Sequence, residues 1–171
     1  THALKLMNAS RRSLLRGRFQ ADAPSLRLPW ALDDSTFTEH CTRCSDCLRA
    51  CPEQIIVKGD GGFPQVNFDA GGCTFCHACV DVCQQPVFHR EESPWSAIAV
   101  INQQCLTQQQ VFCQNCKDAC DTSAIRFRFS TAGISVPQID SAACTGCGAC
   151  VAPCPTHAIQ IQPASTKAHE S

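Results

Sequence analysis

Near its C-terminus the chain reads Cys144-Thr145-Gly146-Cys147-Gly148-Ala149-Cys150-Val151-Ala152-Pro153-Cys154-Pro155. The cysteines of this stretch follow the spacing C-x2-C-x2-C-x3-C, and a proline comes directly after the last one. All sixteen cysteines of the 171-residue chain fall into four groups that end in C-x2-C-x3-C. The groups are Cys41, Cys44, Cys47, Cys51; Cys73, Cys76, Cys79, Cys83; Cys105, Cys113, Cys116, Cys120; and Cys144, Cys147, Cys150, Cys154.

This spacing is the run that binds a four-iron, four-sulfur cubane in bacterial ferredoxins. A structural zinc site instead needs two C-x2-C knuckles separated by a longer loop, and every group here overshoots that arrangement. An even cysteine count would also suit a disulfide scaffold, but such scaffolds rarely repeat one tight cluster four times. The sequence therefore predicts four [4Fe-4S] clusters as cofactors and one-electron transfer as the chemistry.

The last cysteine of each group is expected to serve a different cluster from the first three. In two-cluster ferredoxins the fourth cysteine ligates the other cluster. Short connections favour pairing the first group with the second and the third with the fourth, over a nested arrangement of first with fourth and second with third. The sequential pairing gives a first set of Cys41, Cys44, Cys47 and Cys83; a second of Cys73, Cys76, Cys79 and Cys51; a third of Cys105, Cys113, Cys116 and Cys154; and a fourth of Cys144, Cys147, Cys150 and Cys120.

The sequence departs from the ferredoxin spacing in two places that affect these sets. Seven residues separate Cys105 from Cys113, so the chain between them must loop out, and the alternative for Cys105 is a buried free cysteine. Pro52 and Pro155 follow their cysteines directly, whereas Cys83 and Cys120 are followed by other residues. We expect the ligand pattern to survive both departures.

The segments between the groups predict the fold class. Ile55–Lys58, a glycine turn and Gln65–Phe68 read as a hairpin, and so do Ile125–Phe129, Gly133 and Ile134–Ile139. Ile98–Ile101 and Ile159–Ile161 supply further strands. The sequence thus predicts an α+β protein of two tandem bacterial-type ferredoxin modules, over residues 37–92 and 97–163, joined near Glu91-Glu92-Ser93-Pro94 and followed by a flexible tail, 164–171.

Residues 1–36 form a basic N-terminal arm. Basic residues outnumber acidic ones in the arm. The whole chain, in contrast, has a formal charge of −1 before clusters are counted, and about −9 with four clusters at about −2 each. Ser10-Arg11-Arg12 resembles a twin-arginine export motif, but the apolar stretch that such a signal needs does not follow. We therefore expect the arm to stay attached and Arg11, Arg12, Arg16 and Arg18 to dock a partner. Met7 is the single methionine, so we expect the native start there, with Thr1–Leu6 upstream of it.

Several function classes receive no support from the sequence. It contains no Ser/His/Asp arrangement, phosphate loop or dinucleotide glycine pattern, so we expect no catalytic site. No segment approaches the ~20 apolar residues that cross a membrane. We expect neither a membrane span nor a nucleic-acid partner.

The residues resemble those of the NapF family, ferredoxin-type accessory proteins of periplasmic nitrate reductase systems. The resemblance rests on Met7–Arg12, Pro29-Trp30, Gly61–Pro64, Ser123–Ile125, Cys144–Cys150 and the seven-residue gap in the third group, and it runs from about Met7 to Ile161. It implies a cytoplasmic four-cluster protein that meets the immature catalytic subunit NapA before export and handles electrons for its maturation. The alternative is a steady-state electron relay for a respiratory or cytosolic oxidoreductase, and the electron donor stays open.

Modules of this size bury little apolar surface, so the clusters must act as the core and folding must be coupled to their insertion. We expect the iron-free protein to be largely unfolded. Circular dichroism during heating tests this, and a cooperative thermal transition in iron-free protein would contradict it.

Overall fold

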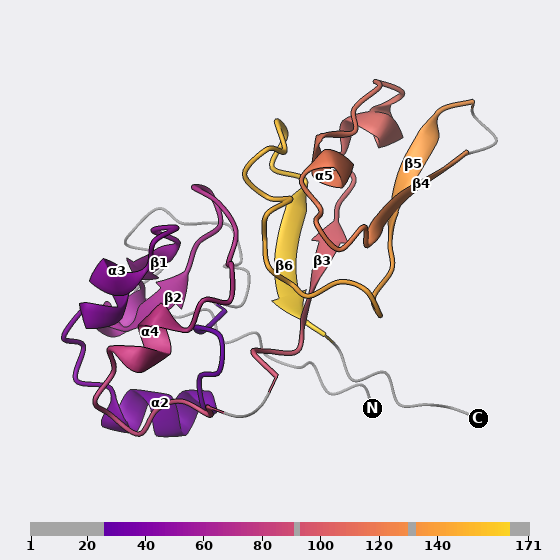
Figure 1. Cartoon of the computed structure of the whole chain (residues 1–171). Helices are drawn as coiled ribbons and strands as arrows, with labels where there is room; N and C mark the ends of the chain where they lie inside the picture. The colour runs from indigo at the N-terminus through magenta and orange to yellow at the C-terminus, as the bar shows by residue number, and fades with distance from the viewer. Residues whose placement is uncertain (1–25, 91–92, 130–132, 165–171) are drawn as a thin grey trace, which may run out of the picture.

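A computed structural model of the chain describes residues 26–90, 93–129 and 133–164. Figure 1 shows two lobes that follow each other along the chain. The first lobe contains α2 (Asp34–His40), α3 (Asp46–Ala50), β1 (Ile56–Lys58), the 3₁₀ turn η1 (Asp60–Gly62), β2 (Pro64–Val66) and α4 (Ala78–Asp81). The second contains β3 (Ala97–Ile101), η2 (Leu106–Gln109), α5 (Asn115–Asp118), β4 (Ile125–Phe129), β5 (Ser135–Ile139) and β6 (Ile159–Pro163).

Both predicted hairpins are confirmed. Strands β1 and β2 pair antiparallel with Ile56 opposite Val66, and Gly61 at φ 64° supplies the turn between them. Strands β4 and β5 pair antiparallel with Ile125 opposite Ile139. In both pairs the β-branched residues nearest the cysteines are buried, because they face the inside of their lobe.

The strands predicted at the ends of the second module also pair. Strand β3 runs antiparallel to β6, with Ile101 opposite Ile159, so the first and last strands of the lobe close it. Figure 1 shows this pair between the first lobe and the β4–β5 hairpin. All the sheets in the described residues are therefore antiparallel and two-stranded.

The first lobe closes in a related way through a segment that the sequence analysis assigned to the arm. An isolated antiparallel bridge joins Ala31 to Phe88, and the N–H of Leu32 donates to the carbonyl of Val87 at 2.9 Å. Leu28 and Trp30 lie just before this bridge and are only 2% and 5% exposed. The carbonyl of Leu26 also accepts from the N–H of Val66 at 3.1 Å, so the described part of residues 1–36 is packed on the first module from Leu26 onward.

The helices are short and depend on local caps and on burial. Helix α2 begins after Asp33, whose carboxylate accepts hydrogen bonds from the N–H groups of Ser35 and Thr36, both at 3.1 Å. The Ser35 side chain, whose hydroxyl also donates to Asp33, and then the Thr36 side chain and these N–H groups hold the pKa of Asp33 well below its usual range. Phe37 anchors the helix with 1% exposure. Most of the buried side chains of both lobes belong to one contiguous core.

No helix in the described ranges is both long and apolar enough to cross a bilayer. Several predictions fall outside the described residues: the arm up to residue 25 with its arginines, Glu91 and Glu92 of the linker, and 165–171 of the tail.

The closing contact of the first lobe predicts a stability effect. Val87 is 1% exposed, so Val87→Ala should lower the free energy of unfolding by about 1–3 kcal/mol through lost burial and a residual cavity. Anaerobic guanidinium denaturation followed by circular dichroism measures this. The matched control is Val82→Ala, because Val82 is 38% exposed and its truncation should stay within about 0.5 kcal/mol of wild type. Equal midpoints for the two variants would contradict the packing of residues 28–32 against Val87.

Candidate functional site

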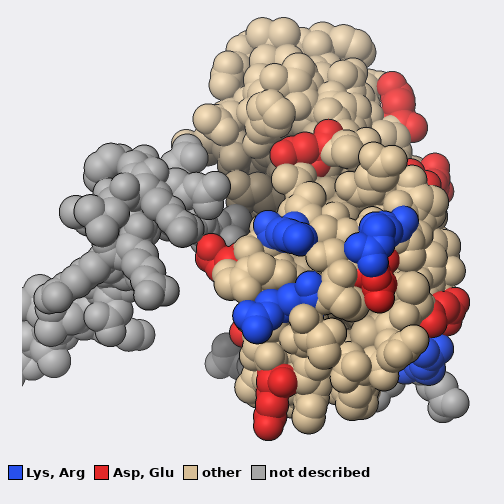
Figure 2. Space-filling model, turned by 90° about the vertical axis from the view of Figure 1, so that its left-hand side faces the viewer, with Lys and Arg blue, Asp and Glu red and all other residues tan. Residues whose placement is uncertain are grey.

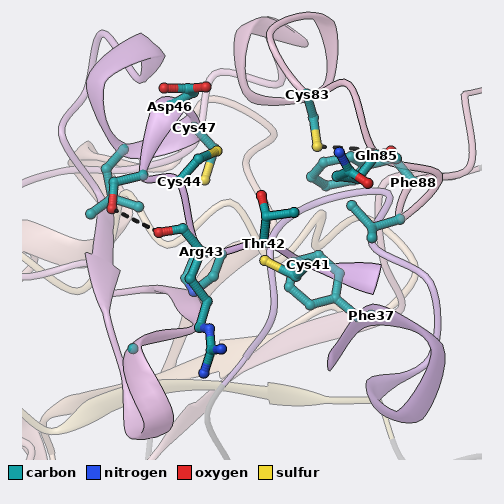
Figure 3. Close-up of a pocket in the computed structure, with 15 residues that line it drawn as sticks. Phe37, Cys41, Thr42, Arg43, Cys44, Asp46, Cys47, Cys83, Gln85 and Phe88 are labelled. Atoms are coloured by element: carbon teal, nitrogen blue, oxygen red, sulfur yellow. Dashed lines mark hydrogen bonds between the residues drawn. The ribbon is translucent and has the colours of Figure 1, made fainter. Parts of the chain in front are cut away.

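The first set of cysteines surrounds one small cavity. Cys41, Cys44 and Cys47 come from the loop and helix after α2, and Cys83 follows α4. Figure 3 shows the Cys83 sulfur on the opposite side of the space from Cys44 and Cys47, with Cys41 below. Phe37 and Phe88 contribute to the apolar wall. The fourth cysteine of the second group is therefore brought to the first three cysteines of the first group.

The second set lines a cavity of the same kind. It holds Cys73, Cys76 and Cys79 from around α4 together with Cys51, the residue that ends α3. Ile55, Ile56 and Val66 complete the wall from the hairpin. Packing of α3 against α4 places the two cavities side by side, and it brings the thiols of Cys47 and Cys79 close enough to interact electrostatically.

The third set meets despite its long gap. Cys105, Cys113, Cys116 and Cys154 line one cavity with Phe127 and Ile159. The residues between Cys105 and Cys113 fold into η2, and Gln110 at φ 64° reverses the chain after it. Thr107 is 1% exposed, and its hydroxyl lies 3.2 Å from the Cys105 sulfur. The extra residues therefore form an ordered turn that returns the chain to the cavity.

The fourth set is the least closed. Cys150 is buried in the same core cluster as Cys116 of the third set, and Cys144 packs against that cluster. Cys144 and Cys147 both contribute to the raised pKa of Cys150. The Cys120 sulfur lies 3.6 Å from the Thr122 hydroxyl. The position of Cys120 as the fourth member stays a prediction.

Burial makes several thiols harder to deprotonate when no metal is bound. It raises the pKa of Cys47, Cys73 and Cys116 to about 11 and that of Cys79 and Cys150 to about 12. Neighbouring thiols add to the effect in each case. At Cys120 burial acts in the same direction, but hydrogen bonds from Thr122 and from backbone N–H groups outweigh it and lower the pKa. Thiolates gathered in such cavities need a cation to compensate their charge.

Backbone N–H groups reach some of the sulfurs. Phe75 donates to Cys73 at 3.4 Å, Ala99 to Cys144 at 3.5 Å, and Ala158 to Cys154 at 3.3 Å. Hydrogen bonds to ligand sulfur stabilise its negative charge and are one of the means by which a protein sets a cluster's reduction potential. The bonded sulfurs belong to the second, fourth and third sets.

The donor set and its spacing fit a cubane better than the alternatives. All sixteen cysteines are free thiols, so the structure contradicts a disulfide framework. Zinc would draw four sulfurs to about 2.3 Å from one point. Within the described ranges, no three His, Cys, Asp or Glu side chains converge closely enough to hold a single ion. The thiols surround spaces, as the corners of a cluster require.

Charged side chains lie on the surface around the cysteine cavities. Figure 2 shows the face on the first lobe's side, where basic and acidic residues are interspersed. Arg27 pairs with Asp34 at 2.5 Å, and the Arg27 and Arg43 guanidinium groups lie over the Phe63 ring. Arg43 lines the first cavity, and both cations are held by local partners.

Sequence reasoning missed the residues that join the two lobes. Trp95 lies between Phe68 and Phe75 of the first lobe, with ring centroids 6.2 Å and 5.8 Å away, and its indole N–H donates to the carbonyl of Thr145 at 2.9 Å. The N–H of Cys73 donates to the carbonyl of Cys147 at 2.7 Å. The only signal in the sequence was glycine beside cysteine in both places, Gly71-Gly72-Cys73 and Gly146-Cys147-Gly148.

Comparison with known proteins gives matches that agree with this geometry. A family model described as a 4Fe-4S dicluster domain matches twice, at residues 40–87 and 111–158. The chain is 44% identical over 157 residues to a ferredoxin-type protein NapF of Escherichia coli K12, covering 91% of this chain and 96% of that protein. It is 45% identical over 165 residues to the Haemophilus influenzae protein of the same name, covering 90% and 94%. A methylamine utilization ferredoxin-type protein MauM of Methylorubrum extorquens is 29% identical over 154 residues, covering 79% and 70%.

Two dicluster domains and sixteen cysteines account for four [4Fe-4S] clusters, and the antiparallel hairpins with few short helices agree with tandem ferredoxin-like modules. The chain is therefore an iron–sulfur electron-transfer protein that belongs to the NapF family of ferredoxin-type proteins.

Proposed function

We propose that each of the four sets binds one cluster and that the protein acts as an accessory factor for the nitrate reductase catalytic subunit NapA. The first part is supported by three cavities that each gather one complete sequential set of four cysteines. The nested alternative would require cysteines of the first and fourth groups to share a cavity. The bound clusters supply one-electron redox chemistry, and the chain's own contribution is to shield, space and tune them.

The assignment of Cys105 gives the sharpest test of the sets. Cys105→Ser should lower the iron content by about one iron if a three-iron cluster remains, or by about four if the whole cluster is lost. Iron and sulfide analysis with electron paramagnetic resonance of an anaerobic preparation measures both outcomes. Val111→Ser is the control, because Val111 lies in the same loop and is 50% exposed. Wild-type iron and an unchanged spectrum in Cys105→Ser would show that Cys105 is not a ligand.

The second part of the proposal concerns the partner and the place. The observation that carries it is the 44% identity to a NapF protein over nearly the whole of both chains. The family resemblance implies that NapA is met in the cytoplasm before export, and that electrons are supplied while its own centres are being installed or reduced. The protein then needs no catalytic site of its own, because it provides electrons and a docking surface.

The basic arm is the proposed docking element. Arg11, Arg12, Arg16 and Arg18 contrast with the acidic, cluster-bearing body, so they suit contact with a partner that the body's own charge would repel. Replacing all four by Gln should slow association with signal-bearing NapA about tenfold at low salt while iron content stays at the wild-type value. Surface plasmon resonance under anaerobic conditions measures the rate.

A matched control separates the arm from net charge. Replacing Arg49, Arg90, Arg126 and Arg128 by Gln removes the same charge from the body. Equal slowing in both variants would contradict specific docking by the arm.

Affinity capture from fractionated cells distinguishes maturation from relay. Capture of signal-bearing, cytoplasmic NapA agrees with the accessory role. Capture of mature reductase or of a membrane quinol-oxidising complex, together with a need for the protein at every turnover, would replace that role by steady-state electron relay.

A further inference from the structure

The lobes meet at the point where the second and fourth cysteine sets approach each other. The N–H of Cys73, in the second set, donates to the carbonyl of Cys147, in the fourth set, at 2.7 Å. We infer that this contact is the crossing for electrons between the two modules, so that the sets are connected in the order first, second, fourth, third. The inference concerns the purified protein and does not depend on its partner.

Close backbone approach at this contact is possible only because of glycines. A Cβ on Gly72 would lie 2.8 Å from the N, Cα and Cβ atoms of Ala149. A Cβ on Gly148 would lie 2.1 Å from the ring of Phe68, and one on Gly146 would lie 2.5 Å from the carbonyl oxygen of Ala97. Gly146 and Gly148 also have φ values of +69° and +79°, which favour glycine. A side chain at Gly72 or Gly148 would hold the two lobes apart, whereas one at Gly146 would press on β3 within the second lobe.

Several groups around the contact are buried. Phe68 and Cys150 are 8% and 7% exposed, and Gly146 and Gly148 are also buried. Trp95 also bridges the lobes through Phe68, Phe75 and Thr145. A direct backbone contact between two ligand loops keeps the separation of the centres short.

Links within each lobe complete the order. Helix α3, with Cys47, packs against α4, with Cys79, so the first and second sets adjoin. Cys116 of the third set and Cys150 of the fourth are buried in the same core cluster. Each step along this order moves one electron. The donor side is oxidised by one electron, the acceptor side is reduced by one, and no bond forms or breaks. A low-potential one-electron reductant starts the sequence, dithionite in the experiment below.

The experiment compares neighbouring glycines in the intact holo-protein. Gly72→Leu drives a side chain into Ala149, whereas Gly71→Leu is the control, because a Cβ there has only a Glu53 carboxylate oxygen nearby, at 3.9 Å. After dithionite reduction, electron paramagnetic resonance at two microwave frequencies detects spin coupling as splittings that do not scale with field. Wild type and Gly71→Leu should show coupling that links all four centres. Gly72→Leu, with wild-type iron content, should lose the part that links the modules and keep the coupling within each module.

Trp95→Ala provides a second variant that leaves the sequence of both cysteine loops unchanged. It removes the bridge between the lobes and should weaken the same inter-module coupling. Unchanged coupling in Gly72→Leu and Trp95→Ala at full iron content would overturn the inference. If the wild-type spectrum shows two independent pairs of coupled centres, with no coupling between the pairs, the inference also fails, whatever the variants do. Neither result would bear on docking to NapA.

Discussion

Bonds between cysteine sulfur and iron are the interaction on which the rest of this structure depends. The described helices are seven residues or shorter and the described sheets are two-stranded, and such elements are marginal in water on their own. The largest fully buried side chains line or border the cysteine cavities, as Phe37 and Ile55 do. Removing the iron would leave thiols with raised pKa around apolar spaces and little else to hold the loops. The same bonds therefore provide both the fold and the redox chemistry.

One short helix region carries ligands for two clusters, and this arrangement follows from the same constraint. Cys47 precedes Cys51 by one turn of α3, yet the two residues face different cavities. A short helix that carries ligands for two centres fixes their separation without a large core. Repeating this device twice produces two modules, and the remaining freedom lies in how the modules meet. Gly72 and Gly148 limit that freedom, because the lack of a Cβ lets Ala149 pack against Gly72 and the Phe68 ring pack against Gly148 across the lobes.

The sequence was most informative where a local rule applies. Cysteine spacing gave the groups, and β-branched runs around Gly59–Gly62 and Gly133 gave both hairpins, since turn chemistry and strand propensity act over a few residues. Closure of the first lobe by Ala31 and Phe88 was missed, because a single bridge between distant segments has no periodic pattern. The same holds for Trp95, whose partners are spread over two lobes. The η2 turn was predicted as a loop but not as an ordered one, since Thr107 shows its burial only in the folded chain.

The surroundings of the sets also differ in ways that no motif records. Cys44 and Cys76 are exposed, whereas Cys79, Cys116 and Cys150 are buried in the shared core. Charges in a poorly solvated region interact more strongly than charges at the surface. With clusters bound, an electron added at one set would therefore disfavour a second electron at the adjoining set. A chain of centres arranged in this way takes up electrons one at a time, with neighbouring positions filled last. That behaviour suits a protein that delivers single electrons to a partner, because each departure relieves repulsion at the adjoining position.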